Sequence, residues 1–115
     1  MAWNIEFVAE AERWWDGLND DEQAKLGAAF DELERHGPLL PTFKSKGILT
    51  SRHDSMRELR IQHKGRPYRV LFAFDPRRVA IVLLGGDKTG DDRWYQKNVP
   101  IADKRFDIHL KSLKK

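Results

Sequence analysis

The spacing of hydrophobic residues changes from strand-like to helical within the first third of the chain. Trp3–Val8 alternates between apolar and polar residues, which predicts a short strand. In residues 9–18 and 20–36, apolar side chains recur every three or four positions, as on one face of an amphipathic helix. Asn19, with a glutamate three residues later, is a typical helix N-cap, and Gly37 followed by proline ends the second helix. This part of the chain therefore predicts a strand and a helical hairpin.

Strand-like patterns dominate the middle of the chain. Met56–His63 alternates between polar and apolar residues, whereas Tyr68–Phe74 and Val79–Leu84 are apolar on both faces. Strands that are apolar on both faces are buried on both, so these two are expected at the centre of a sheet. Lys64-Gly65, between the first two strands, fits a two-residue hairpin turn.

The remaining segments are a loop and a C-terminal helix. Residues 37–52 contain two prolines, two glycines and scattered basic residues, and they are long for a plain connector, which makes them a functional candidate. The chain from Asp91 onward has helical spacing, and Pro100 either kinks this helix or begins a new segment. The order β-α-α-β-β-β-α predicts one α+β domain over residues 1–115. We expect an antiparallel sheet with the N-terminal helical hairpin on one face, and a C-terminal helix.

The hairpin turn determines which side chains face each other. If Lys64-Gly65 is a two-residue turn, Leu59 faces Val70 on the core side, and Arg60 faces Arg69 on the other side. A four-residue turn keeps the same faces, whereas a three-residue loop changes the parity. Two opposed arginines repel each other, which costs little if both reach water, and they also form a good clamp for phosphate. We therefore treat Arg60 and Arg69 as candidate phosphate ligands, with a solvated surface as the alternative.

Charge is distributed unevenly along the chain. Residues 1–43 carry three Lys/Arg and ten Asp/Glu, whereas residues 44–115 carry eighteen and eight. A basic half favours a polyanionic partner, because it attracts phosphate and releases counterions, although a merely solvated surface is the alternative. The chain has no cysteine, no apolar run long enough for a membrane span and no signal-peptide pattern, so we expect a cytoplasmic protein without membrane association.

A glycine-rich segment and an aromatic pair supply further candidate chemistry. Residues 85–90, Gly-Gly-Asp-Lys-Thr-Gly, match neither a P-loop nor a dinucleotide-binding fingerprint, and we expect a turn that brings Lys88 beside Arg69. Lysine there can stabilise charge on a phosphate or protonate a leaving oxygen. Tyr95, in the first turn of the last helix, is a candidate to orient or deprotonate a hydroxyl. Trp94 is a candidate for stacking on a base, with core packing as the alternative.

Other basic residues are weaker candidates. Arg57 and Arg66 are interpreted as rim charges that contact RNA, and His63 as a further RNA contact. His53 and His63 are also candidate general acids or bases. Histidine spacing matches no metal motif, and no metal or other cofactor is expected.

Several of these segments together carry a resemblance to a known family. The stretch Met56–Asp75, the segment Leu84–Gly90 and the aromatic pair after it resemble the RelE/ParE toxin superfamily, and most closely its HigB-like, phage-derived branch. The resemblance implies a compact α+β toxin of a type II toxin–antitoxin system. It also implies that the protein enters the ribosomal A site and cleaves mRNA, and that a cognate antitoxin exists, in this branch usually a helix-turn-helix protein.

The resemblance also implies roles for particular residues. Arg69 matches the family's catalytic arginine, Lys88 the basic residue after the last strand, Arg60 a basic position in the second strand and Tyr95 the late aromatic. Where the best-known member has two lysines in the second strand, this sequence has methionine and Glu58. The leading hypothesis is thus metal-free cleavage of mRNA through its 2′-hydroxyl. The alternatives are a ParE-like inhibitor of DNA gyrase and a non-catalytic module that binds RNA or protein.

Overall fold

The computed structural model describes residues 2–114 and is built around the hairpin of β3 (Met56–His63) and β4 (Arg66–Phe74). The predicted domain 1–115 also includes Met1 and Lys115, which lie outside the described residues. Lys64 and Gly65 have φ of 52° and 77°, as a two-residue turn matched to strand twist requires. The predicted register is confirmed, because Arg60 pairs with Arg69 and Leu59 with Val70.

The five-stranded sheet has the order β1-β5-β4-β3-β2. It adds β1 (Ile5–Phe7), β5 (Ala80–Asp87) and β2 (Ser45–Gly47) to the hairpin. The expected α+β class is confirmed, but the expectation of a wholly antiparallel sheet is wrong, because β1 pairs with β5 in parallel. Helices and three strands lie between β1 and β5 in sequence, and a long connection of this kind permits parallel pairing. β2 is a strand within the segment that the sequence predicted as a loop.

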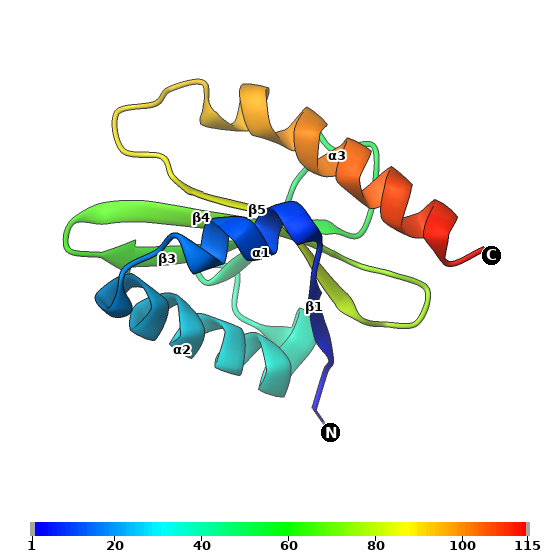
Figure 1. Cartoon of the computed structure of the whole chain (residues 1–115), viewed down its shortest axis with the longest axis horizontal. Helices are drawn as coiled ribbons and strands as arrows, with labels where there is room; N and C mark the ends of the chain where they lie inside the picture. Colours follow the sequence, from blue (N-terminus) through cyan, green and yellow to red (C-terminus); the bar gives the residue numbers. More distant parts are fainter. Residues whose placement is uncertain (1, 115) are drawn as a thin grey trace.

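Helices cover both faces of the sheet (Figure 1). α1 (Ala9–Asp16) and α2 (Asp20–His36) lie on one face, and the short 3-10 helix η1 (Gly37–Leu39) follows them. α3 (Trp94–Ser112) lies on the other face and continues through Pro100 without beginning a new segment. Asn19 caps α2 in a reciprocal capping box, as its sequence pattern predicts. No helix in residues 2–114 is long and apolar enough to cross a membrane.

The alternation of side chains along the strands divides the core into two layers. Leu59 and Val70 point toward α1 and α2, whereas Met56 and Leu71 point toward α3. Glu58, on the same strand as Met56 and two residues away, therefore faces α3. Glu58 and Arg69, two charged residues on the α3 face, are both buried.

Two glycines of β5 are required by tryptophan side chains above and below them. A Cβ at Gly85 would lie 2.3 Å from the ring of Trp14, and one at Gly86 would lie 3.1 Å from Nε1 of Trp94. Both glycines belong to a strand that runs to Asp87. The expectation that the turn begins at Gly85 is therefore wrong. The glycines allow two indoles to approach the strand, and the chain reverses only after Asp87.

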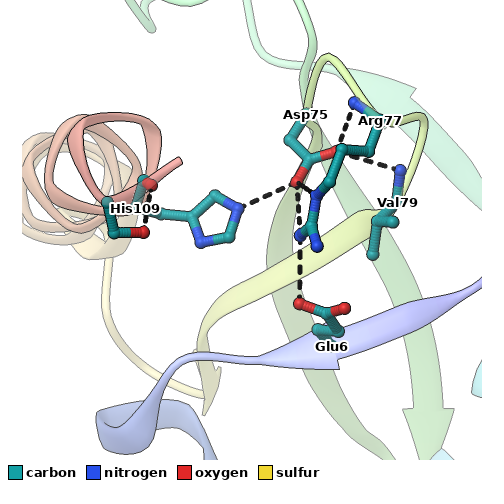
Figure 2. Close-up of polar contacts among 6 residues, drawn as sticks. Glu6, Asp75, Arg77, Val79 and His109 are labelled. Atoms are coloured by element: carbon teal, nitrogen blue, oxygen red, sulfur yellow. Dashed lines mark hydrogen bonds and ion pairs between the residues drawn. The ribbon is translucent and has the colours of Figure 1, made fainter. Parts of the chain in front are cut away.

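A buried carboxylate fastens the C-terminal end of α3 to the sheet (Figure 2). Asp75, whose side chain is fully buried, accepts hydrogen bonds from Arg77 and from the backbone N–H of Val79. His109 of α3 contacts Asp75 Oδ2 through Nε2 at 2.9 Å, and Arg77 also reaches Glu6 of β1 at 3.1 Å. This network joins β1, the β4–β5 turn and α3, and it leaves the opposite end of α3 to form the candidate site.

Candidate active site

Polar side chains from three elements meet beneath the first turn of α3. Glu58 and Arg60 come from β3, Arg69 from β4 and Tyr95 from α3. Arg60 and Arg69 are opposed in register, and Glu58 lies two residues from Arg60 on the same face. The sheet therefore fixes the three charged residues, and α3 adds the tyrosine. We call these four residues the cationic cluster.

Glu58 is at the centre of the cationic cluster. Its side chain is only 6% exposed, and Oε1 accepts a hydrogen bond from the hydroxyl of Tyr95 at 2.9 Å. The same oxygen lies 3.2 Å from Nε of Arg69 and 3.4 Å from Nε of Arg60. The sequence pattern alone predicted no catalytic role for Glu58. The alternation of side chains along β3 could have identified Glu58, because it places this acid on the same face as the opposed arginines.

The two arginines differ in how firmly they are held. Arg69 has a side chain 9% exposed, and it donates from Nε to the oxygen of Tyr95 at 3.1 Å and from a terminal nitrogen to the carbonyl of Tyr68 at 2.9 Å. The side chain of Arg60 is 37% exposed. Arg69 is thus a fixed cation, whereas Arg60 presents a guanidinium to solvent, where a phosphate can reach it.

The hydroxyl of Tyr95 is a proton donor in this environment. Burial raises the pKa of Tyr95, and the hydrogen bond to Glu58 raises it further, although Arg69 acts in the opposite direction. The phenol therefore stays protonated at neutral pH. This result favours Tyr95 as a group that orients a hydroxyl or passes a proton to a neighbour over Tyr95 as an independent base.

Lys88 is beside the cationic cluster. It follows β5, and its backbone N–H donates to the carbonyl of Pro67 at 3.0 Å, which ties the turn to the start of β4. Its ammonium lies 5.8 Å from the ring centroid of Tyr95, and the two side chains line the same shallow hollow. The structure therefore brings together Arg60, Arg69, Lys88 and Tyr95, the four residues predicted as catalytic.

The structure does not bring the predicted RNA contacts Arg57, His63 and Arg66 to the cationic cluster. Arg57 and His63 share the strand face of Leu59, which points toward α1 and α2. Arg57 donates to the side chain and carbonyl of Ser45. Arg66 lies near Asp87 instead, and His63 is edge-on to Tyr68. Strand alternation explains the difference, because odd-numbered residues of β3 face away from Arg60.

Two aromatic candidates are structural residues. Trp94, predicted to stack on a base, is 5% exposed and packs in the α3 layer of the core, edge-on to Tyr95. It therefore has no free ring face for a base. His53 contacts Asp107 at 2.7 Å and packs edge-on against Phe106, so it helps to hold its loop on α3.

Comparison with curated proteins identifies similar bacterial chains. The chain is 46% identical over 106 residues to a protein named Putative toxin HigB3 of Mycobacterium tuberculosis, with 91% of each chain covered. It is 38% identical over 112 residues to Putative toxin HigB2 of the same organism, covering 93% of this chain and 56% of that protein.

Solved structures and a family profile agree with this similarity. A free-state mutant of the Escherichia coli toxin RelE matches with a TM-score of 0.61 at 17% identity, covering 87% of this chain and 97% of the other. Isolated E. coli RelE matches with a TM-score of 0.57 at 17% identity, covering 83% and 94%. These two matches show a RelE-like fold. The profile of the family described as Phage derived protein Gp49-like matches residues 13–107. With HigB3 and HigB2 as relatives, the chain belongs to the HigB-like, Gp49-like phage-derived family.

Proposed function

We propose that this chain is the toxin of a type II toxin–antitoxin system and that it cleaves mRNA in the ribosomal A site. The observation that carries the proposal is the contact between a buried carboxylate, Glu58, and a protonated phenol, Tyr95, flanked by two arginines. The similarity to HigB3 and HigB2, both named as toxins, supports the same class. Such a set provides an acceptor, a donor and cationic groups for a phosphate within one small region of the sheet.

The arginines and Lys88 are the groups that bind the scissile phosphate. A guanidinium binds two phosphate oxygens at once, and Arg60 is exposed enough to do so. Arg69, held by Tyr95 and the carbonyl of Tyr68, is placed to stabilise the additional negative charge of the pentavalent transition state. The basic half of the chain, residues 44–115, contributes the long-range attraction to RNA.

Cleavage then proceeds by attack of the 2′-hydroxyl on the adjacent phosphorus. Tyr95 accepts the 2′-hydroxyl proton as it passes its own proton to Glu58, so that the phenol stays neutral overall. The 2′-oxygen forms a bond to phosphorus as the bond to the 5′-oxygen breaks, and Lys88 donates a proton to the leaving oxygen. The products are a 2′,3′-cyclic phosphate and a 5′-hydroxyl end. This step needs only groups that the chain itself carries.

Induction of the chain in growing cells tests this proposal. Primer extension on abundant messages is expected to show cuts within codons that appear only when those codons are translated. Glu58→Gln is expected to abolish the cuts and the growth arrest, since an amide keeps the shape of the side chain but cannot accept the proton. Glu32→Gln is the matched control, because Glu32 pairs with Lys44 beside α2 and lies outside the cationic cluster. Growth arrest with intact messages would contradict cleavage.

The proposed partner is a cognate antitoxin, expected to be a helix-turn-helix protein encoded by an adjoining reading frame. A toxin that cleaves mRNA must be held inactive during growth. In the proposed type II system, a second protein binds the toxin and inhibits it. Co-purification of the two gene products tests this part of the proposal, and failure of the chain to form a complex with its neighbour would contradict it.

A further inference from the structure

β3 has an open edge where β2 ends. β2 pairs with β3 only from Arg57 to Leu59, and one further bond joins the N–H of Arg60 to the carbonyl of Lys44. The N–H of Lys44 turns back to Pro41, so it does not reach the carbonyl of Arg60. Beyond this point, β3 continues to His63 with no strand on its outer side within residues 2–114.

Gln62 presents its backbone at this open edge. The bonds of Met56 and Arg60 to the β2 side show that even-numbered residues of β3 point their N–H and C=O groups outward. Gln62 follows the same alternation, so its N–H and C=O point away from β4. An exposed strand edge of this kind is a template for pairing with a further strand.

A groove runs between this edge and α2. It has a volume of about 410 Å³, and its apolar lining comes from both sides: Ala28, Ala29, Leu40, Phe43 and Ile61. Phe43 is 70% exposed, which is unusual for a large aromatic side chain. A helix beside an open strand edge forms a groove in which an extended peptide adds a strand and buries alternate side chains.

The charges along the groove favour an acidic occupant. Lys25, Lys44 and Arg60 line it, and Glu32 is the only acidic residue in its lining among the described residues. Lys44 is paired with Glu32, which leaves Lys25 as the cation inside the groove that an incoming acid would meet. The side chain of Arg60 contacts Glu58 on the α3 face, but it is 37% exposed and can be reached at the strand edge. This basic groove lies next to α2, which begins with three acidic residues, Asp20, Asp21 and Glu22.

We infer that this groove binds an extended, apolar and acidic segment of the antitoxin as an additional strand on β3. The inference rests on the proposed toxin–antitoxin function. Residues of the segment on either side of the one paired with Gln62 would insert apolar side chains between α2 and β3. The residue paired with Gln62 itself would point to the α3 face, where an acidic side chain reaches Arg60 diagonally. The antitoxin thereby neutralises a phosphate-binding arginine of the cationic cluster without covering the whole site.

Two pairs of variants test the inference by titration calorimetry with the purified antitoxin of the adjoining reading frame. Gln62→Pro removes the outward N–H but no bond to β4, and it is expected to weaken binding at least tenfold. Gln62→Ala keeps the N–H and is expected to bind within twofold of the parent chain. Lys25→Glu is expected to weaken binding at least fivefold. Arg35→Glu makes the same change of charge on α2 outside the groove, and as the control it is expected to leave the affinity unchanged.

Each outcome of these titrations distinguishes the inference from the function on which it rests. A parent chain that binds no antitoxin contradicts the toxin–antitoxin proposal itself. A parent chain that binds, with Gln62→Pro and Lys25→Glu binding equally well, overturns the groove alone. Light scattering excludes or identifies a second copy of this chain as the occupant: a dimer that Gln62→Pro abolishes would overturn the assignment to an antitoxin. Hydrogen exchange at the Gln62 amide is expected to slow in the complex, which a distant docking site would not cause.

Discussion

The hydroxyl of Tyr95 donates to Oε1 of Glu58 over 2.9 Å, and this contact joins the first turn of α3 to β3. Residues 37 positions apart are thereby brought to one point, because α3 lies across the sheet face to which even-numbered residues of β3 point. The pairing gives the carboxylate a proton donor and gives the phenol an acceptor. It therefore links the packing of the last helix to the chemistry proposed for the cluster.

The two tyrosines of the chain provide a matched test of that link. Tyr95→Phe removes the hydroxyl that contacts Glu58, and we expect mRNA cleavage to slow by roughly 100-fold, the usual effect of losing one acid–base group. Tyr68→Phe removes the hydroxyl that donates to Glu22 on the opposite face, and it should leave the rate unchanged. Each change should cost about 1 kcal/mol of unfolding free energy, measured by denaturant titration. Equal rates for the two variants would show that the Tyr95 hydroxyl has no chemical role.

Two exposed arginines on opposite faces test where RNA binds. Arg60→Ala should weaken binding of a single-stranded RNA and lower the slope of log K against log salt by about 0.7, since one phosphate contact is lost. Arg66→Ala removes the same charge near Asp87, outside the cationic cluster, and should leave the slope unchanged. Fluorescence anisotropy over a range of salt concentrations measures both. If Arg66→Ala had the larger effect, the binding face would be the one covered by α1 and α2.

The tryptophan contacts of β5 predict a steric effect at Gly85. Gly85→Ala places a Cβ 2.3 Å from the Trp14 ring, so the indole must move, and we expect a loss of roughly 1 to 3 kcal/mol in unfolding free energy. In Gly47→Ala the nearest atom is 3.8 Å away, on a flexible arginine side chain, so this control should change stability little. Guanidinium titrations of the two variants make the comparison. A stable Gly85→Ala variant would contradict the close packing of Trp14 on β5.

The buried carboxylate of Asp75 predicts acid sensitivity of the fold. Burial alone would raise the pKa of Asp75, but hydrogen bonds with His109 and Arg77 hold it below its ordinary value of 3.8. The native state therefore keeps the charge where the unfolded chain would take up a proton. The resulting stabilisation is complete well above pH 3.8 and is lost as the pH falls through the lower native pKa.

Asp75→Asn should therefore destabilise the protein at neutral pH and flatten its pH dependence. We expect a loss of roughly 2 to 4 kcal/mol at pH 7, because a buried charge that binds Arg77 and His109 is removed. The difference from the parent chain should shrink as the pH approaches 3, measured by urea unfolding. Asp92→Asn, at an exposed position in the loop before α3, is the control. A difference that stays constant with pH would contradict a charged Asp75 in the native state.

Local patterns were sufficient for much of the fold and for part of the site. The capping residues of α2, the two-residue turn and the opposition of Arg60 and Arg69 follow from spacing and turn chemistry alone, and the structure confirms them. Lys88 was predicted beside Arg69, and in the structure its ammonium lies 5.8 Å from the ring of Tyr95, whose hydroxyl accepts a hydrogen bond from Arg69. These features depend on residues close in sequence or on one register that a turn determines.

The features that could not be predicted depend on contacts between distant segments. β1 pairs in parallel with β5, and β2 pairs with β3, at the two edges of the sheet. These pairings depend on where the helices leave the chain in space, and the hydrophobic periodicity of a segment does not encode that position. In the sequence, Gly85 looks like a turn residue. The side chain that requires a glycine at this position is Trp14, which is far away in the sequence. Glu58 carried a signal in its alternation with Arg60, but its burial depends on α3.

The central claim is that the cationic cluster cleaves mRNA on the ribosome, and the most direct measurement is a cleavage assay with purified components. Ribosomes stalled at a defined codon are incubated with the chain, and the new RNA ends are identified by mass spectrometry. We predict a single cut in the A-site codon, with a 2′,3′-cyclic phosphate on the upstream fragment, a 5′-hydroxyl on the downstream fragment and no cut without ribosomes. Intact mRNA at stoichiometric toxin, particularly if the same preparation inhibits DNA supercoiling by gyrase, would contradict it.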